Sequence, residues 1–290
     1  MIEIGIPPNL LLLGGEFVLS WHGFFAAVSI LIAVFLVGRW APLFGLESDD
    51  VYTVASFAII GGIIGARLVH VLDNVGYYSE NPTAILAIWK GGIGLWGGLI
   101  GGFVGGAAYS KWAKLPIGNL ADLAAPAVLY TIAIGRIGDI VNGEHCATNS
   151  EAWYSFSWTA LMSNAAFCKS SGGVNAWMHP VIAMEIFWCM IGLFFIWRLV
   201  GKVSPSGMVF ALALSWYAIG RFLIQLLRVD KVWVFGLQEA HFISLVILCI
   251  TIPLILIKAK WNFDRGWRDI LNFEMPSETE GSSRAERRRK

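Results

Sequence analysis

Seven long apolar runs alternate with polar connections along most of this chain. They cover about residues 18–38, 52–73, 93–110, 119–140, 181–200, 208–228 and 238–259. A transmembrane α-helix needs roughly 20 predominantly apolar residues, and each run comes close to that length. The pattern predicts an all-α, polytopic membrane protein with seven transmembrane helices.

Composition supports this prediction. Hydrophobic residues make up 57% of the 290 positions and charged residues 14%, whereas ordinary soluble domains carry about 25% charged residues. The alternative is a very apolar soluble core. Continuous stretches such as LVILCITIPLILI argue against it, because a soluble helix keeps a polar face.

Lysine and arginine are distributed unevenly between the two sets of loops. Of 21 such residues, 14 lie in one set together with the C-terminal segment, 4 lie in the opposite set, and 3 lie inside apolar runs. Positively charged loops stay on the cytoplasmic side, so we expect an outer N-terminus and a cytoplasmic C-terminus. Residues 1–262 then form a membrane domain, and the polar, basic residues 263–290 form a disordered cytoplasmic tail.

The long segment 141–180 then lies outside the cytoplasm. It is rich in Trp, Phe and Tyr, which favours a small folded extracytoplasmic cap over a flexible linker. Cys146 and Cys168 can pair there if the compartment is oxidising, and two free thiols are the alternative. The stretches GGIIGAR and GGIGLWGGLIGGFVGG repeat small residues at helical spacing, which indicates closely packed transmembrane helices.

Several polar residues fall inside the apolar runs, where a charge is costly and suggests function. With the orientation above, Arg67, Arg136 and Arg221 all lie in the outer half of the membrane. The inward-running helices place further residues near their outer starts, namely His22, Trp96, Glu185 and His241. We expect these side chains to gather at one depth below the outer surface.

Guanidinium groups match phosphate bidentately and keep their charge, and an outer-leaflet phospholipid places its phosphate at about this depth. Asp139, Asn142 and Glu144 could hold the arginines or bind a hydroxylated headgroup. Structural alternatives stay open. Arg136 and Asp139 share a helix face and could neutralise each other, Arg67 could bind backbone carbonyls, and the glutamate of the fifth run could be a structural partner.

Six ordered motifs resemble those of the bacterial phosphatidylglycerol–prolipoprotein diacylglyceryl transferases. GRIGDIVNGE resembles the family signature. The other five segments are SWHGFF, GARLVHVL, IWKGGIGLWGGLIGG, HPVIAMEI and WYAIGRFLIQLLRVD. Seven helices, an outer N-terminus and a periplasmic head also fit this family.

The resemblance implies an enzyme that transfers the diacylglyceryl group of phosphatidylglycerol to the lipobox Cys thiol of a prolipoprotein. A thioether forms and glycerol phosphate leaves. The implied partners are phosphatidylglycerol, the prolipoprotein signal peptide and membrane lipids, in the bacterial inner membrane with the site facing the outer leaflet. We expect no cofactor, because the sequence shows neither metal-ligand spacing nor a dinucleotide loop. It also shows no nucleic-acid motif.

The resemblance and the polar residues together give one set of candidates. The candidate catalytic residues are Arg136, Arg221, Glu144 and His22. The candidate phosphatidylglycerol-binding residues are Arg136, Asp139, Asn142, Arg221, Tyr217, Arg228 and Trp96.

Four positions depart from the family pattern. Trp96 stands where many members have His, and an indole cannot accept a proton from a thiol. His22 stands where Tyr is common, while Asp139 and Gln225 replace a usual Asn and a usual Glu. A thiol must lose its proton to become a good nucleophile. We therefore expect His22 or Glu144 to assist that deprotonation.

Two other function classes stay open. Trp96 favours an inactive relative that binds lipid or lipoprotein precursors without turnover. A lipid transporter or scramblase would also present outer arginines, but its polar groups should continue toward the inner leaflet, where this sequence has few.

Overall fold

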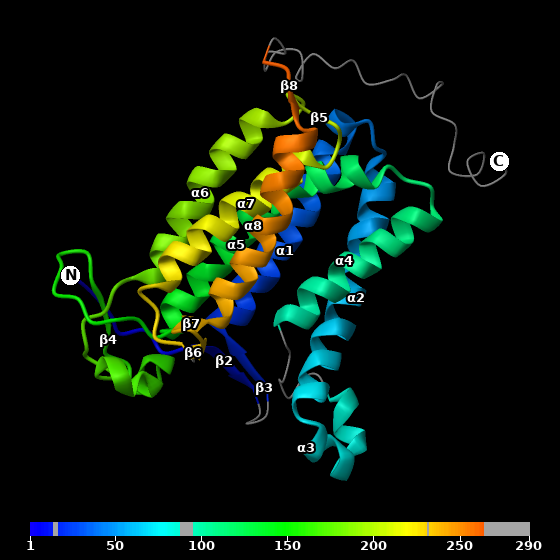
Figure 1. Ribbon diagram of the computed structural model, residues 1–290. Coiled ribbons are helices and arrows are strands. Elements are labelled where there is room, and N and C mark those ends of the chain that lie inside the picture. Colours follow the sequence, from blue (N-terminus) through cyan, green and yellow to red (C-terminus); the bar gives the residue numbers. More distant parts are fainter. Residues whose placement is uncertain (14–16, 88–94, 231, 264–290) are drawn as a thin grey trace. The chain divides into compact units, whose positions relative to one another are not determined.

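The computed structural model is mostly helical (Figure 1). It describes residues 1–13, 17–87, 95–230 and 232–263. Within them, residues 1–36 and 121–263 form one compact unit and residues 37–120 form a second. Apart from residue 263, the predicted basic tail lies outside the described residues.

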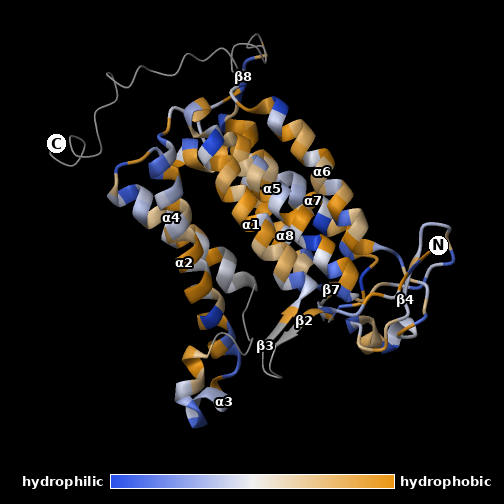
Figure 2. Ribbon diagram, turned by 180° about the vertical axis from the view of Figure 1, so that it is seen from behind, coloured by the Kyte–Doolittle hydropathy of each residue, from blue (hydrophilic) through white to orange (hydrophobic). Residues whose placement is uncertain are grey.

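Six helices of the described chain are long and apolar enough to cross a membrane, so the protein is a multi-pass membrane protein. They are α1 (Trp21–Trp40), which continues into η1 (Ala41–Phe44), α2 (Ser48–Asp73), α5 (Ile117–Asn142), α6 (Val181–Leu199), α7 (Met208–Gln225) and α8 (Glu239–Lys258). Apolar residues cover much of each helix (Figure 2). The remaining predicted run forms α4 (Leu95–Trp112), which is rich in glycine, carries Ser110 and Lys111 in its last turn and is not among these six.

Short strands in the connections qualify the all-α prediction. Four two-stranded sheets occur in the described residues. They pair β1 (Ile2–Ile4) with β4 (Phe156–Trp158), β2 (Asn9–Leu13) with β3 (Phe17–Ser20), β5 (Val203–Ser204) with β8 (Lys260–Trp261), and β6 (Val232–Val234) with β7 (Leu237–Gln238). Each strand has at most five residues, which is too few for the alternating pattern that identifies a strand in sequence.

Glycines bring α2 and α4 into backbone contact within the unit of residues 37–120. A Cβ on Gly65 would lie 2.2 Å from the carbonyl oxygen of Gly97, and one on Gly61 would lie 2.4 Å from that of Gly101. No larger side chain fits at these distances, so the predicted close packing of small residues is confirmed. After α2 the chain forms α3 (Val75–Glu80) and η2 (Pro82–Leu86).

In the other unit, Gly138 lets the last turns of α5 approach the start of α1. A Cβ at this position would lie 2.5 Å from the carbonyl oxygen of Trp21 and 2.6 Å from Cα of His22. The missing side chain therefore allows the backbone contact that brings the His22 ring beside Asp139, the next residue of α5.

Two tryptophans fix α6 against α7. The rings of Trp188 and Trp216 stack with their centroids 4.5 Å apart. Each indole Nε1 donates to the carbonyl oxygen of the other residue, at 2.7 and 2.9 Å. Each ring fills the space beside a glycine of the opposite helix, Gly192 or Gly220. This contact fixes the position of Glu185 on α6 relative to Arg221 on α7, each about one turn from its tryptophan.

A carboxylate of α5 holds the N-terminal end of α7 in place. Asp122 accepts hydrogen bonds from the backbone N–H groups of Gly207, at 2.8 Å, and Phe210, at 2.9 Å. A helix begins with N–H groups that have no partner within the helix. Asp122 therefore acts as an N-terminal cap supplied by a neighbouring helix and holds α5 and α7 together.

Residues 143–180 fold between α5 and α6 into a segment that we call the head. It contains β4, η4 (Asn164–Phe167) and η5 (Lys169–Ser171), and β1 pairs with β4 in parallel. Trp158 and Met178 belong to a core that continues into the first turn of α6. Cys146 and Cys168 form a disulfide, which decides between the two alternatives that the sequence left open.

We expect the disulfide to stabilise the head. The two cysteines are 22 residues apart, and a loop of this length restricts the unfolded chain enough to contribute about 2–4 kcal/mol. The Cys146→Ser, Cys168→Ser double variant should therefore unfold at a lower temperature in detergent. Cys249→Ser is the control, because Cys249 is an exposed free thiol. Equal unfolding temperatures for the double variant and the wild type would contradict this prediction.

Candidate active site

Charged and polar side chains from four helices meet at the end of α5 that leads into the head. We call them the charged cluster. Its members are His22 of α1, Arg136, Asp139 and Asn142 of α5, Glu185 of α6, Tyr217 and Arg221 of α7, and Glu144, His145 and Arg228 of the segments after α5 and α7. The structure thus brings together all the candidate catalytic and phosphatidylglycerol-binding residues of this unit, whereas His241, which was expected at the same depth, is not a member.

Glu185 is the buried centre of the charged cluster, with 1% of its surface exposed. Its Oε1 accepts hydrogen bonds from the hydroxyl of Tyr217 at 2.7 Å and from Nη2 of Arg136 at 3.2 Å. Its Oε2 lies 3.4 Å from Nη1 of Arg221. A buried charge is tolerated only when it is paired and hydrogen-bonded, and these contacts meet that condition. Glu185 therefore connects the arginines of α5 and α7.

Asp139 is shared between an arginine and a histidine. Its Oδ2 accepts from Nη1 of Arg136 at 2.7 Å, which is the pairing that their spacing of three residues predicted. Its Oδ1 is hydrogen-bonded to Nδ1 of His22. The Asp139 side chain is 2% exposed and that of His22 is 49% exposed. The pair therefore connects the buried arginine to an accessible imidazole.

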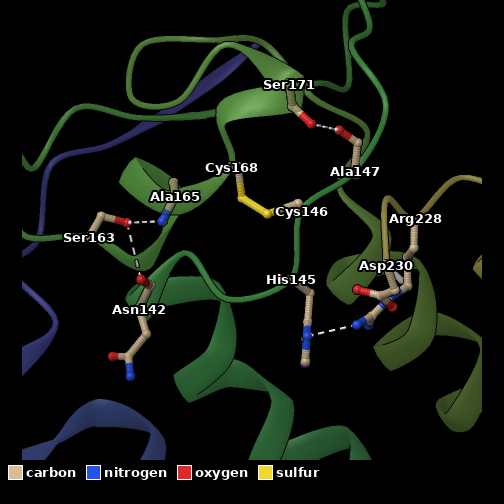
Figure 3. The surroundings of a disulfide bond; sticks show 10 residues. All are labelled: Asn142, His145, Cys146, Ala147, Ser163, Ala165, Cys168, Ser171, Arg228 and Asp230. Atoms are coloured by element: carbon tan, nitrogen blue, oxygen red, sulfur yellow. Dashed lines mark hydrogen bonds and ion pairs between the residues drawn. A yellow bond between two sulfur atoms is a disulfide. The ribbon is translucent and has the colours of Figure 1, made fainter. Parts of the chain in front are cut away.

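Asn142 and Glu144 extend the charged cluster on the head side. Nδ2 of Asn142 donates to Oε1 of Glu144 at 3.0 Å, and Oε2 of Glu144 lies 3.7 Å from Nδ1 of His22. Ser163 of the head donates to the carbonyl oxygen of Asn142 at 3.0 Å (Figure 3). Gly143, with φ 68°, provides the left-handed turn between Asn142 and Glu144.

His145 lies between two arginines. Its Nε2 is 2.8 Å from Nη1 of Arg136, and its Nδ1 is 2.7 Å from Nη2 of Arg228 (Figure 3). Burial, together with the positive charges of Arg228 and Arg136, lowers the pKa of His145 to about 3, so the ring is neutral. A neutral imidazole has one acceptor nitrogen. It can therefore accept a hydrogen bond from only one of the two guanidinium groups.

Arg228 is buried, with 5% of its surface exposed. Its Nε donates to Oδ2 of Asp230 at 2.9 Å. Its Nη1 is buried and has no hydrogen-bond partner within the described part of the chain. A buried N–H group without an acceptor costs about 1–3 kcal/mol, and more when the group is charged. Together with the single acceptor nitrogen of His145, this leaves guanidinium N–H groups beside His145 without an acceptor, which suits an anionic ligand.

Other polar candidates lie outside the charged cluster. Arg67 belongs to the unit of residues 37–120, where it donates to the carbonyl oxygens of Ile85 at 2.8 Å and Ala84 at 2.6 Å. This is the carbonyl-binding alternative of the sequence analysis. His241 is buried at the start of α8, where it accepts from the backbone N–H of Gln238 at 3.2 Å. The side chain of Trp96, in the first turn of α4, lies outside the described residues.

Three side chains of the charged cluster could also hold a metal ion. Within the described ranges, His22, Asp139 and Glu144 each offer one ligand atom, all within 4.8 Å of one another. Nη1 of Arg136, however, already occupies Oδ2 of Asp139, and its positive charge repels a cation at this distance. We therefore assign no metal to these residues.

The sequence analysis missed the roles of His145 and Gly138. His145 directly follows the Asn142-Gly143-Glu144 end of the signature, so its position was a signal, but its two guanidinium contacts depend on how α5 and α7 pack. Gly138 lies inside the signature, where it reads as one of many small residues of a transmembrane helix.

These helices and contacts define a multi-pass membrane protein whose charged cluster combines three arginines and three carboxylates with a half-exposed histidine. The sequence profile described as prolipoprotein diacylglyceryl transferase matches residues 8–257 of the chain. The phosphatidylglycerol–prolipoprotein diacylglyceryl transferases of Staphylococcus aureus strains Newman and JH9 are each 33% identical to it, over 245 and 244 residues, and the match covers 83% of this chain and 86% of each relative. The chain belongs to the prolipoprotein diacylglyceryl transferase family.

Proposed function

We propose that the protein transfers the diacylglyceryl group of phosphatidylglycerol to the lipobox Cys of a prolipoprotein. The thiolate sulfur attacks the diacylglyceryl carbon that carries the phosphate ester, so a C–S bond forms and a C–O bond breaks. Glycerol phosphate leaves with the electrons of that bond. The family match supports this reaction. The observation that carries it is the shortage of hydrogen-bond acceptors around Arg228 and His145, which a phosphate would relieve.

The arginines bind the phosphate in this proposal. Negative charge grows on the phosphate oxygens as the C–O bond breaks, and fixed guanidinium groups stabilise charge that develops in the transition state. Arg136 and Arg228 both direct N–H groups at His145, and Arg221 makes one long contact with Glu185. Their remaining N–H groups are the donors that we assign to the phosphate.

The other candidates assist binding or deprotonation. We assign Asn142 and Asp139 to the headgroup side of the site, and Tyr217 orients Glu185 between the arginines. The proton of the thiol passes to His22 or Glu144, which lie close to each other. Trp96 stays a proposed phosphatidylglycerol-binding residue on the basis of its place in the family motif.

In this proposal α4 is the seventh span, and the N-terminus and the head lie outside the cytoplasm. The disulfide of the head supports this orientation, because disulfides persist in oxidising compartments. Residues 1–262 then form the membrane domain of a bacterial inner-membrane protein, and residues 263–290 form its cytoplasmic tail. The charged cluster faces the outer leaflet, where both substrates are accessible.

Purified protein in phosphatidylglycerol vesicles tests the reaction directly. We expect a lipobox peptide to gain one diacylglyceryl group on its Cys, detected by mass spectrometry, and a peptide with Ser in that place to stay unmodified. Loss of the adduct when another phospholipid replaces phosphatidylglycerol would support the assigned donor. Protein that binds phosphatidylglycerol but forms no adduct would refute the transferase proposal in favour of a lipid-binding relative.

A further inference from the structure

His22 and Asp139 form a pair that resembles the base and orienting carboxylate of a catalytic triad. Nδ1 of His22 donates to Oδ1 of Asp139, and Oε2 of Glu144 lies 3.7 Å from the same nitrogen. Both of these contacts therefore involve Nδ1. About half of the side chain is exposed, and these two contacts leave Nε2 for a ligand.

We propose that His22 is the proton acceptor for the lipobox thiol and that Asp139 is the residue that positions it. This rests on the proposed transferase function. Asp139 holds the hydrogen of the neutral imidazole on Nδ1, which leaves the lone pair on Nε2. The thiol gives its proton to Nε2 and becomes the thiolate that attacks the lipid. The proton later leaves with glycerol phosphate or into water, and His22 is neutral again.

The charges around His22 fit this role. Asp139 of α5 and Glu144 of the head are the carboxylates beside it, and both stabilise the imidazolium that forms when the ring takes a proton. The positive charge of Arg136 of α5 disfavours the imidazolium, but this charge is paired with Asp139 and Glu185. The ring of His145, 3.8 Å from Asp139, is neutral. Glu144 is hydrogen-bonded to Asn142, so we assign it to charge stabilisation rather than to proton transfer.

One carboxylate thus connects the two halves of the reaction. Oδ1 of Asp139 contacts the base, and Oδ2 contacts Arg136, which we assign to the phosphate. Gly138 makes this possible, because any side chain there would push the start of α1 away from α5. The base that we assign to the thiol and the arginine that we assign to the phosphate ester therefore both contact Asp139, in the last turns of α5.

Removing the base should change how the rate depends on pH. We expect His22→Phe to lower turnover on the lipobox peptide by roughly 100-fold at pH 7, which is the low end of general-base contributions. Its rate should then rise about tenfold per pH unit toward the thiol pKa of about 8.5, whereas the wild-type rate should be flatter. His70→Phe, a histidine of α2 outside the charged cluster, should keep the wild-type profile.

A more acidic nucleophile separates deprotonation from the other steps. A selenocysteine lipobox peptide is already ionised at pH 7 and needs no base, so it should restore most of the rate of His22→Phe. It should not rescue Arg136→Ala, which lacks a phosphate contact. Full activity of His22→Phe on the cysteine peptide, or a loss that the selenol does not rescue, would refute the proposal. Wild-type protein that modifies neither peptide would instead refute the transferase function itself.

The positioning role of Asp139 has its own readout. In ¹⁵N spectra of histidine-labelled protein, the His22 signals should show hydrogen on Nδ1 in the wild type. The amide of Asp139→Asn can donate to Nδ1 and favour hydrogen on Nε2, so its spectrum should shift and its cysteine-peptide turnover should fall, with rescue by the selenol. An unchanged tautomer with unchanged turnover would refute this role. Loss of wild-type activity in EDTA would also refute it, because His22, Asp139 and Glu144 would then hold a metal.

Discussion

Arg136→Ala is expected to remove nearly all diacylglyceryl transfer while the protein stays folded. Arg136 contacts Asp139, Glu185 and His145 at once, and we assign its remaining N–H groups to the phosphate. Loss of a charge-assisted contact in a buried site costs roughly 2–5 kcal/mol, which corresponds to a rate about 30-fold to several thousandfold lower. Turnover in phosphatidylglycerol vesicles measures this effect.

The fold of the variant should survive because the carboxylates keep other partners. Glu185 retains Tyr217 and Arg221, and Asp139 retains His22. Thermal unfolding in detergent checks this. Arg198→Ala is the matched control, because Arg198 stacks on Phe194 in the last turn of α6, at the opposite end from Glu185. Folded Arg136→Ala protein with near wild-type turnover would rule out the proposed phosphate site.

Glu185→Leu is expected to have the largest effect on stability. It leaves the partly buried guanidinium groups of Arg136 and Arg221 without their shared carboxylate and the Tyr217 hydroxyl without its acceptor. Breaking a buried ion pair from one side typically costs about 3–5 kcal/mol. Glu185→Gln should cost less, because an amide keeps one acceptor oxygen. Unfolding temperatures in detergent, compared among the variants and the wild type, measure the difference.

A surface glutamate provides the control for this series. Glu151 is exposed in the head, so Glu151→Gln should unfold like the wild type. If Glu185→Leu also unfolded at the wild-type temperature, the network around Glu185 would contribute nothing to stability. The arginines would then be held by other contacts.

The sequence located the membrane helices well because their signal is local. An apolar run of this length identifies a span, and α1, α5, α6 and α8 each begin and end within about three residues of the predicted runs. The strands in the connections escaped prediction because each is only two to five residues long. Their pairing, such as β1 with β4, joins segments about 150 residues apart, and no local pattern records that contact.

The site was predictable in its membership but not in its contacts. Arg136, Asp139 and Arg221 stood out because charges are rare inside apolar runs. Which carboxylate meets which arginine depends on helix packing, so the central position of Glu185 and the link from Asp139 to His22 appear only in the structure. Arg67 carried the same signal as the other arginines, yet it donates hydrogen bonds to the backbone carbonyls of Ala84 and Ile85.

If the arginines bind the phosphate as proposed, the ion pairs of Glu185 and Asp139 make lipid binding an exchange rather than a simple gain. The guanidinium groups already have carboxylate partners within the chain, so a phosphate bound there competes with these internal anions. Net affinity is then the small difference between two large attractions. A weakly held lipid suits an enzyme whose substrate surrounds it in the bilayer, because binding energy is most useful when it appears only in the transition state. In the proposed reaction the same competition would favour release of glycerol phosphate before the next lipid binds.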